Sequence, residues 1–291
     1  MVQTNKNGLS RTIPEGVKRK VRKDAGFGCV LCGNAICEYE HVDPEWADAT
    51  THNPRFMTLL CGSCHSKKTR GIIGVDTVKH AMANPKCKER GYSNDWLDFG
   101  KKKPVVQLGG TLFHDTISLI SINSESIFSI LPPDPKIPNS PYRIFALFTD
   151  IDGNVLLGIK ANEWFGNADN WDIESVGRKL LIRKKLGEIS LILENIPGDK
   201  IVIHKINMDY KGYKIRGDSK ELMVSTPTRD LIKIDMGGEI HGKVALNIIG
   251  ERLIMDRMKI KNAKIDFGGN VLLSNSTIIG CHIDGGALNQ K

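Results

Sequence analysis

Four cysteines stand in two Cys-x-x-Cys pairs, Cys29/Cys32 and Cys61/Cys64. Together the pairs supply four thiolates, and four thiolates form the closed tetrahedral shell of a structural zinc site. A module of about sixty residues with few large apolar side chains builds little core of its own. We therefore expect the zinc ion to contribute much of the folding free energy of this region.

The distribution of the seven cysteines favours metal binding over disulfide bonds. Their number is odd, and Cys281 alone lies outside the first third of the chain. A disulfide framework would use an even and more widely spread set. Cys37 and Cys87 have no close partner motif, and we interpret them as ordinary thiols rather than as ligands of a second metal.

Acidic and histidine side chains lie beside both cysteine pairs. Glu40 and His41 belong to the segment Tyr39–Pro44 between the pairs, and His65 directly follows the second pair. Here the chain resembles the HNH endonucleases, over roughly residues 11–71. The resemblance implies a β-hairpin and a following helix that hold one catalytic divalent ion, with the zinc site joining hairpin to helix.

The resemblance also implies a role for each of these side chains. His41 would be the general base that takes a proton from water, a task that suits an imidazole near neutral pH. His65 would bind the catalytic metal. Glu40 stands where the family often has Asp, and its carboxylate would be a hard ligand for Mg²⁺ or Mn²⁺. The reaction would be metal-assisted hydrolysis of a phosphodiester bond, with in-line attack by water.

One position departs from the family pattern. The family usually has Asn five residues before the third cysteine, and Phe56 stands there. In the family this Asn steadies the backbone and the general-base histidine, whereas a phenyl ring forms no such hydrogen bond. Asn53 is our first candidate for a substitute and His52 the second; otherwise the enzyme is slower, or the module binds DNA without cutting it.

Three helices are expected in the first third of the chain. Pro14 to Ala25 predicts a short basic helix that ends at Gly26. A polar helix is expected from Ser66 to Arg70, ending at Gly71, and another from Asp76 to Ala83. The loose, lysine-rich stretch that follows, up to Pro104, marks a domain boundary.

The pattern of apolar and polar residues changes after this boundary. Short runs of Ile, Leu, Val and Phe separated by Gly, Asn and Asp predict an all-β domain over residues 105–291, with a sub-boundary near 225–230. The segment Asp152–Asn154 predicts a hairpin turn, since Asp-Gly tolerates positive φ. One helix is expected to interrupt the strands, from Ile173 to Val176.

The end of the chain carries a weak internal repeat. The segment Lys259–Ile265 echoes Ser276–Ile283, with a turn expected at Gly285-Gly286, and such an echo is compatible with a short β-solenoid. The fold class we expect is α+β: a small zinc-stabilised ββα-metal module over residues 11–75, a helix and basic linker over 76–104, and a mainly β domain.

Charge is unevenly divided between these parts. Residues 1–103 contain 18 Lys and Arg against 11 Asp and Glu, and the remainder contains 23 against 22. A basic module of this kind favours a polyanionic partner, because phosphate backbones bind Lys and Arg with release of counterions. The other interpretation is a basic surface that serves only solubility. No apolar run reaches membrane-spanning length, and we expect a cytoplasmic protein without membrane contact.

We therefore expect a metal-dependent DNA endonuclease, in a layout that the resemblance associates with bacterial restriction, phage defence or mobile elements. The first alternative is a zinc-dependent DNA-binding protein without catalysis. The second is a nuclease that cleaves RNA, because the same groups could hydrolyse either backbone. The β domain would select the target, contact a protein partner or form a homo-oligomer, and the sequence does not decide among these.

Overall fold

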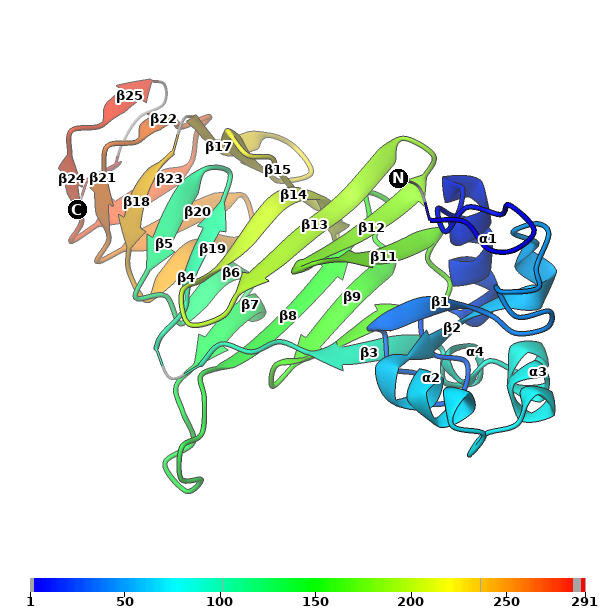
Figure 1. The fold of residues 1–291 in the computed structure, drawn as a ribbon. Coiled ribbons are helices and arrows are strands. Elements are labelled where there is room, and N and C mark those ends of the chain that lie inside the picture. Colours follow the sequence, from blue (N-terminus) through cyan, green and yellow to red (C-terminus); the bar gives the residue numbers. More distant parts are fainter. Residues whose placement is uncertain (1–2, 101, 236, 285–288, 291) are drawn as a thin grey trace. The chain divides into compact units, whose positions relative to one another are not determined.

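The computed structural model describes residues 3–100, 102–235, 237–284 and 289–290, which form few helices and many strands (Figure 1). The chain divides into two compact units. Unit 1 consists of Met1–Asp95 and Phe165–Ser175, and unit 2 of Trp96–Trp164 and Val176–Lys291. Unit 1 is thus built from two stretches of sequence, and the shorter one lies inside the sequence of unit 2.

The first stretch of unit 1 contains all the described helices. In chain order, its elements are α1 (Glu15–Ala25), β1 (Cys37–His41), the 3-10 helix η1 (Pro54–Phe56), β2 (Met57–Cys61), α2 (Gly62–Thr69), α3 (Val75–Ala83), α4 (Lys86–Arg90) and β3 (Tyr92–Trp96). The three predicted helices are confirmed as α1, α2 and α3. Helix α1 ends at Gly26, whose φ of 72° lies in the left-handed region that glycine adopts without strain. Helix α2 begins four residues earlier than expected, directly after Cys61.

An antiparallel hairpin and the helix after it form the centre of unit 1. Strands β1 and β2 pair with Cys37 opposite Cys61 and His41 opposite Met57. All five residues of β2 are buried, whereas β1 is mostly half-buried. Because α2 starts at the end of β2 with no loop between them, the hairpin fixes where the helix begins. The core around the hairpin consists of Val21, Ala25, Cys29, Val30, Val42, Met57, Leu59, Leu60, Cys61, Cys64 and Val78.

A buried ion pair joins the two stretches of unit 1. The Arg22 guanidinium donates two hydrogen bonds to Asp172, from Nε to Oδ1 (2.9 Å) and from Nη2 to Oδ2 (2.8 Å), and a third to Tyr39 Oη (2.7 Å). The side chains of Arg22 and Asp172 are only 6% and 2% exposed. Arg19 adds a cation–π contact, its guanidinium carbon 4.1 Å from the centre of the Trp171 ring.

The helix predicted from Ile173 to Val176 is wrong. The segment forms strand β11 (Asp172–Val176), with Ile173 buried. The β-branched side chains of Ile173 and Val176 favour extended backbone. The pairing of Asp172 with Arg22, which the sequence does not reveal, fixes the start of this strand.

Unit 2 is built from strands. Strand β10 (Glu163–Asn167) leads from unit 2 into unit 1. The others are β4 (Val105–Leu108), β5 (Thr111–His114), β6 (Ser118–Ile122), β7 (Glu125–Leu131), β8 (Arg143–Thr149), β9 (Val155–Lys160), β12 (Lys179–Lys185), β13 (Glu188–Ile196), β14 (Lys200–Tyr210), β15 (Tyr213–Gly217), β16 (Glu221–Ser225), β17 (Asp230–Asp235), β18 (Gly238–His241), β19 (Val244–Ile249), β20 (Arg252–Asp256), β21 (Lys259–Lys261), β22 (Lys264–Asp266), β23 (Val271–Ser274), β24 (Thr277–Ile279), β25 (His282–Asp284) and β26 (Asn289–Gln290).

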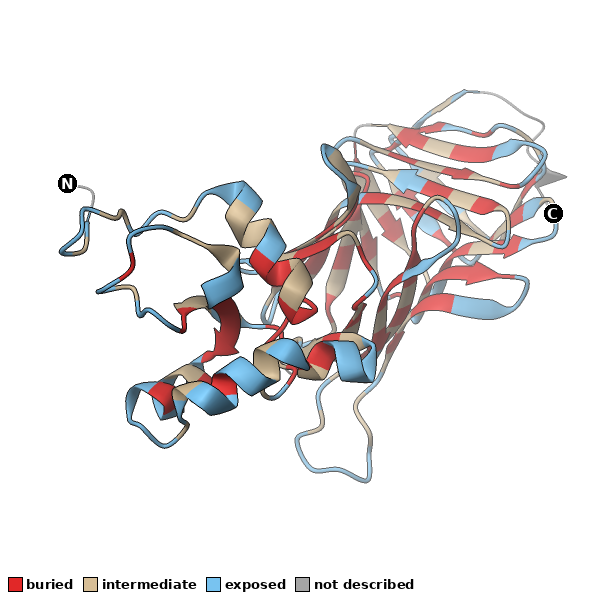
Figure 2. Cartoon of the chain, turned by 90° about the vertical axis from the view of Figure 1, so that its right-hand side faces the viewer, coloured by how far each residue is buried: buried red, intermediate tan, exposed pale blue. Residues whose placement is uncertain are grey.

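These strands form two sheets. One has the order β26-β23-β20-β19-β6-β7-β8-β9, and the other β24-β21-β18-β5-β4-β14-β15-β16-β17-β22-β25, with β13 also paired to β14 and β12 paired to β13. Buried and accessible residues alternate along many strands, as the banded colouring in Figure 2 shows. Phe113, Phe128 and Phe148 are among the largest fully buried side chains. The alternation gives each sheet one face toward a core.

The hairpin predicted at Asp152–Asn154 is confirmed, since β8 and β9 pair antiparallel on either side of this turn. Residues 226–229 form another turn, between the antiparallel strands β16 and β17, in the region where the sequence suggested a sub-boundary.

Parallel pairing dominates the end of the chain. Lys259 of β21 pairs with Thr277 of β24, and Lys264 of β22 pairs with His282 of β25, each partner lying 18 residues further on. The sequence echo between Lys259–Ile265 and Ser276–Ile283 has the same spacing. The turn expected at Gly285-Gly286 lies outside the described residues.

Candidate functional site

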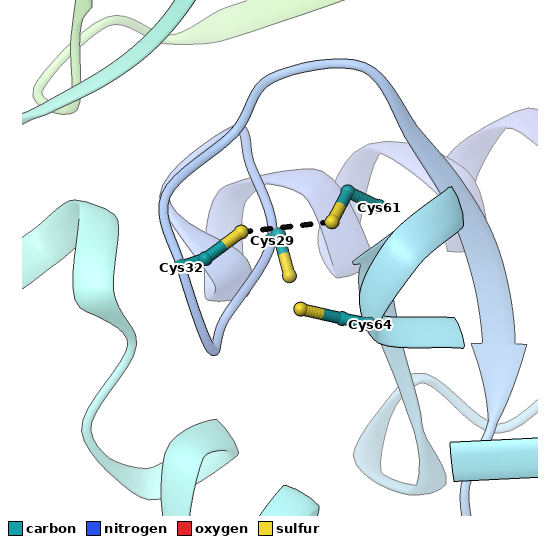
Figure 3. Close-up of side chains that lie close together, drawn as sticks. All are labelled: Cys29, Cys32, Cys61 and Cys64. Carbon is teal, nitrogen blue, oxygen red and sulfur yellow. Dashed lines mark hydrogen bonds between the residues drawn. The ribbon is translucent and has the colours of Figure 1, made fainter. Parts of the chain in front are cut away.

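The four cysteines of the two Cys-x-x-Cys pairs lie close together in unit 1, compatible with a zinc site. Cys29 and Cys32 lie in the loop after α1, Cys61 ends β2, and Cys64 lies in the first turn of α2. Their sulfur atoms all lie within 4.8 Å of one another, and the side chains converge on one point (Figure 3). A single ion at that point would join the loop, the strand and the helix.

The distances between the sulfur atoms fit a metal better than a disulfide. Cys32 Sγ and Cys61 Sγ are 3.6 Å apart, and all four thiols are free. In a tetrahedral zinc site with Zn–S bonds of about 2.3 Å, two sulfur atoms are separated by about 3.8 Å. A disulfide needs about 2.05 Å between its sulfur atoms.

The electrostatics of the cluster also favour a bound cation. The hydrogen bond with Cys29, together with burial, raises the pKa of Cys32 above its ordinary value. Burial and the charge of Cys29 raise the pKa of Cys64 to about 12. Hydrogen bonds from Cys32 and Cys37 lower the pKa of Cys29, and its charge opposes the ionisation of Cys32 and Cys64. A divalent cation removes that opposition by compensating the negative charges.

The two other cysteines of unit 1 support the fold around this cluster. Cys87 is buried, and a Cβ atom added to Gly28 would lie 2.8 Å from its Sγ atom. The Cys37 thiol donates a hydrogen bond to the Asn34 carbonyl (3.1 Å). Within the described part of the chain, neither thiol belongs to a group of metal-ligand side chains.

A cavity of about 410 Å³ contains the side chains for which the sequence predicts catalysis. Glu40 and His41 line it from β1, and His65 lines it from α2. Arg11 and Trp46 lie on its wall, the Arg11 guanidinium carbon 4.2 Å from the centre of the Trp46 ring. The hairpin and the helix that begins at its end thus supply the acid and the two imidazoles.

Glu40 is the centre of the polar contacts in this cavity. Its Oε2 atom lies 3.0 Å from His65 Nε2, and its Oε1 atom accepts a hydrogen bond from Lys68 Nζ (2.7 Å). Lys68 donates a second hydrogen bond to Glu45 Oε1 (2.6 Å), and its side chain is only 6% exposed. Burial disfavours the charge on Lys68, but these two carboxylates outweigh it and raise the pKa of the ammonium group.

His41 is oriented by a second imidazole. His52 Nε2 donates to the carbonyl oxygen of Ser10 (2.8 Å), because a carbonyl can only accept. His52 Nδ1 must then accept in the neutral ring, and His41 Nε2 donates to it (3.1 Å). The lone pair of His41 is therefore on Nδ1. Burial is the largest cause that lowers the pKa of His41 below its ordinary value, so its ring is neutral at pH 7.

The structure assigns different roles to the residues considered as substitutes for the usual Asn. Phe56 is 48% exposed and lines a separate cavity, and its carbonyl oxygen accepts a hydrogen bond from Val42 N–H (2.8 Å), next to His41. Asn53, our first candidate, is wrong as a partner of His41, because its side chain accepts from Arg55 N–H and caps η1. The second candidate, His52, makes the contact.

Sequence reasoning missed two members of the cavity, Lys68 and Glu45. Lys68 follows His65 by three residues in one helix, and residues at this spacing share a face, so the spacing was an available signal. Glu45 carried no signal, because it lies in the loop after β1 and reaches Lys68 only through the fold.

No family model matches the sequence, and comparisons with curated proteins and with solved structures likewise give no match. Among the described residues, the helices are all too short or too polar to cross a lipid bilayer.

Proposed function

We propose that unit 1 is a metal-dependent endonuclease module of the HNH type, which hydrolyses phosphodiester bonds in DNA. The observation that carries this proposal is the 3.0 Å separation of Glu40 Oε2 and His65 Nε2, in the cavity that His41 also lines. Two neighbouring ligands of an octahedral ion with bonds of about 2.1 Å lie about 3 Å apart. The two side chains are thus already spaced as ligands of Mg²⁺ or Mn²⁺.

The order of the elements supports the same proposal. The hairpin β1–β2 is followed directly by α2, and the four clustered cysteines lie in the loop before the hairpin and at the junction of hairpin and helix. This is the arrangement that the resemblance to HNH endonucleases implies, with zinc as the structural ion.

Each side chain has a definite task in the proposed reaction. When bound, the divalent ion would neutralise charge on the scissile phosphate and on its leaving oxygen. His41 Nδ1, which carries the lone pair, takes a proton from water as the water oxygen forms its bond to phosphorus. The bond from phosphorus to the leaving oxygen breaks on the opposite side, and that oxygen takes a proton from solvent. His52 holds the His41 ring in place during this transfer.

Basic side chains support a nucleic acid as the substrate. Arg11 lines the cavity, its guanidinium group stacked on Trp46, and such a group binds a phosphate while the ring limits its motion. Lys68 also lines the cavity and pairs with Glu40, which offsets negative charge there. The excess of Lys and Arg in residues 1–103 extends the positive charge beyond the cavity. Unit 2 would then serve to select the target or to contact a partner.

The test is a nicking assay with supercoiled plasmid, Mg²⁺ or Mn²⁺, and zinc-loaded full-length protein. His41→Ala should lose cutting while retaining DNA binding in a mobility-shift assay, and EDTA should abolish cutting by the wild type. His80→Ala is the matched control, because His80 is an exposed histidine on α3 of the same unit. An equal amount of single-stranded RNA, digested in parallel, separates a DNA nuclease from an RNA nuclease.

Two outcomes would contradict the proposal. If His41→Ala cuts as fast as His80→Ala, His41 is not the general base. If the wild-type protein binds DNA and cuts neither substrate with either metal, unit 1 is a zinc-dependent DNA-binding module without catalysis.

A further inference from the structure

Two histidines and a glutamate lie together on an outer face of a sheet in unit 2, in strands that are far apart in the sequence. Strand β5 pairs in parallel with β18, and the register puts His114 beside His241. Phe113 and Ile240, the residues before the two histidines, are fully buried. Since side chains alternate along a strand, His114, Glu239 and His241 share the opposite face.

The three side chains are close enough to share a ligand. One potential metal-binding atom from each lies within 4.8 Å of the others. The two imidazole rings are stacked, with their centres 4.5 Å apart and their planes 13° from parallel. His241 Nε2 lies 3.2 Å from Glu239 Oε2.

A buried nitrogen atom without a hydrogen-bond partner is a second, independent observation that favours a ligand at this cluster. In the described part of the chain, His114 Nε2 is buried and has no hydrogen-bond partner. Buried polar atoms are almost always paired, and an exception calls for an ion or a water molecule.

We propose that His114, Glu239 and His241 form a second metal site, which takes a divalent transition metal of the zinc class. Two imidazole nitrogens and one carboxylate oxygen are a donor set that suits Zn²⁺, and three protein ligands leave a fourth position open. In such a site the ligand atoms are about 3.3 Å apart, and all three lie within 4.8 Å of one another, so no pair must close by more than about 1.5 Å.

Carboxylates lie near both nitrogens of His241. Nε2 donates a hydrogen bond to Glu239 Oε2 (3.2 Å), and Nδ1 lies 3.7 Å from Asp115 Oδ2. A metal bound at Nε2 would replace the proton there, and the ring would then carry its proton on Nδ1, on the side of Asp115. Lys261 Nζ lies 3.3 Å from Glu239 Oε2 and competes with a bound cation. Glu239 has a second carboxylate oxygen, Oε1, with which it can bind the metal while Lys261 keeps its contact.

One of the three side chains, His241, also lines a cavity that lies entirely within unit 2. This cavity has a volume of about 640 Å³, and His241 lines it together with Asp115, Lys243, Asn247, Asp256 and Arg257. Its mixed charges suit water or a small polar anion as the fourth ligand.

The experiment measures zinc per chain after equilibrium dialysis of full-length protein against micromolar Zn²⁺. The wild type should hold one zinc more than His241→Ala, which should retain the zinc of the cysteine cluster. Glu239→Gln should weaken the additional site at least tenfold, and it keeps the size of the side chain in case His241→Ala disturbs the fold. His204→Ala is the matched control. His204 Nε2 also lies beside a carboxylate, 2.7 Å from Glu194 Oε2, but His204 belongs to no three-residue cluster of metal-ligand side chains among the described residues.

A Co²⁺ titration of the zinc-loaded protein gives a second readout. Cobalt at the proposed site should give an absorption spectrum without a thiolate-to-metal charge-transfer band, because no cysteine belongs to the cluster. The proposal is overturned if His241→Ala, Glu239→Gln and wild type hold equal zinc, or if the additional cobalt shows the thiolate band. Neither readout depends on nuclease activity, so this proposal and the proposed function can fail separately.

Discussion

The imidazole of His41 takes its orientation from a short relay of hydrogen bonds. His41 Nε2 donates to His52 Nδ1, and His52 Nε2 donates to the Ser10 carbonyl. The relay fixes both the direction of the His41 ring and the nitrogen that carries its proton. In the proposed nuclease, these hydrogen bonds would replace those of the amide side chain that the HNH pattern has at the position of Phe56.

We therefore predict that His52→Ala lowers kcat for plasmid nicking by about tenfold or more, since a general base out of position transfers protons poorly. KM should change little, because His52 does not line the cavity. Initial nicking rates at several plasmid concentrations measure both constants.

Asn53→Ala is the control for this prediction, because it removes only the cap of η1 next to His52. Equal kcat values for His52→Ala and Asn53→Ala would show that the relay does not orient the base. A fall in kcat for His52→Ala alone supports it.

At the scale of single residues, the residue types and their spacing predicted the main side chains of the candidate site but not all of the side chains that contact them. The two Cys-x-x-Cys pairs indicated the cluster because ligand spacing in a knuckle is local. His52 and Asn53 are adjacent, and the sequence does not reveal which of them faces His41. His114 and His241 gave no signal, because only the parallel pairing of β5 with β18 brings them together.

At the scale of elements, close packing behind the cysteine loop limits its sequence. A Cβ atom on Gly28 would lie 2.8 Å from Cys87 Sγ and 2.9 Å from the Asn34 carbonyl oxygen. We predict that Gly28→Ala destabilises unit 1 by about 1–3 kcal/mol, because the added methyl group overpacks a closed site. Denaturant unfolding of the zinc-loaded protein, followed by the helical circular dichroism signal, measures the change.

Gly16→Ala is the matched control. Gly16 lies in α1, and a methyl group added there would meet no atom within 4 Å, so alanine should stabilise the helix by about 0.5–1 kcal/mol. If both substitutions shift the unfolding midpoint equally, the tight packing at Gly28 has no energetic consequence.

The carboxylate of Asp150, in the turn between β8 and β9, should make the stability of unit 2 depend on pH. Burial disfavours the Asp150 carboxylate, but the Asn154 side chain and the backbone N–H groups of Asn154 and Asp152 donate hydrogen bonds to it, and on balance its pKa is lowered. A carboxyl group whose pKa is lower in the folded state stabilises the fold above its unfolded pKa of about 3.9. That stability is lost as the pH falls through the lower, folded value.

We therefore predict that Asp150→Asn destabilises the protein at pH 7 and has a smaller effect below about pH 3. Thermal melting of both proteins across this range, followed by the strand signal, measures the difference. A difference in melting temperature that is independent of pH would contradict the role of the charge.

Elements with strong local signals were predictable from the sequence, and elements that depend on distant partners were not. Pro14–Ala25 has a basic helical pattern with a glycine at its end, and Asp152–Asn154 has turn chemistry; both are confirmed. Residues 172–176 are too short a segment for a periodic pattern to distinguish strand from helix. Their conformation depends on Asp172, whose partner Arg22 lies 150 residues earlier.

At the scale of the whole molecule, the two units should respond differently to loss of zinc. All described helices lie in unit 1, which contains the cysteine cluster, and unit 2 has its own strand core. Structural zinc contributes about 10–16 kcal/mol in comparable small modules, more than a module of this size can lose and stay folded. Strong chelation should therefore abolish the helical signal and leave the strand signal.

Circular dichroism during chelation, with zinc release followed in the same sample, measures this. Cys61→Ser should reproduce the chelated state without chelator. Cys281→Ser is the control, because Cys281 lies in unit 2 and outside the cluster. Helical signal that survives complete zinc release would show that the metal is not needed for the fold of unit 1.

The divided sequence of unit 1 has a consequence for synthesis on the ribosome. The cysteines, the hairpin and Arg22 are translated early, but Asp172, which neutralises Arg22 in the core, is translated 150 residues later. At a translation rate of about 5–20 residues per second, Asp172 is synthesised about 8–30 seconds after Arg22. A nascent chain, or a fragment released early, therefore contains the residues of the proposed nuclease site but lacks the buried ion pair between Arg22 and Asp172. The proposed nuclease becomes fully assembled only after a large part of unit 2 has been made.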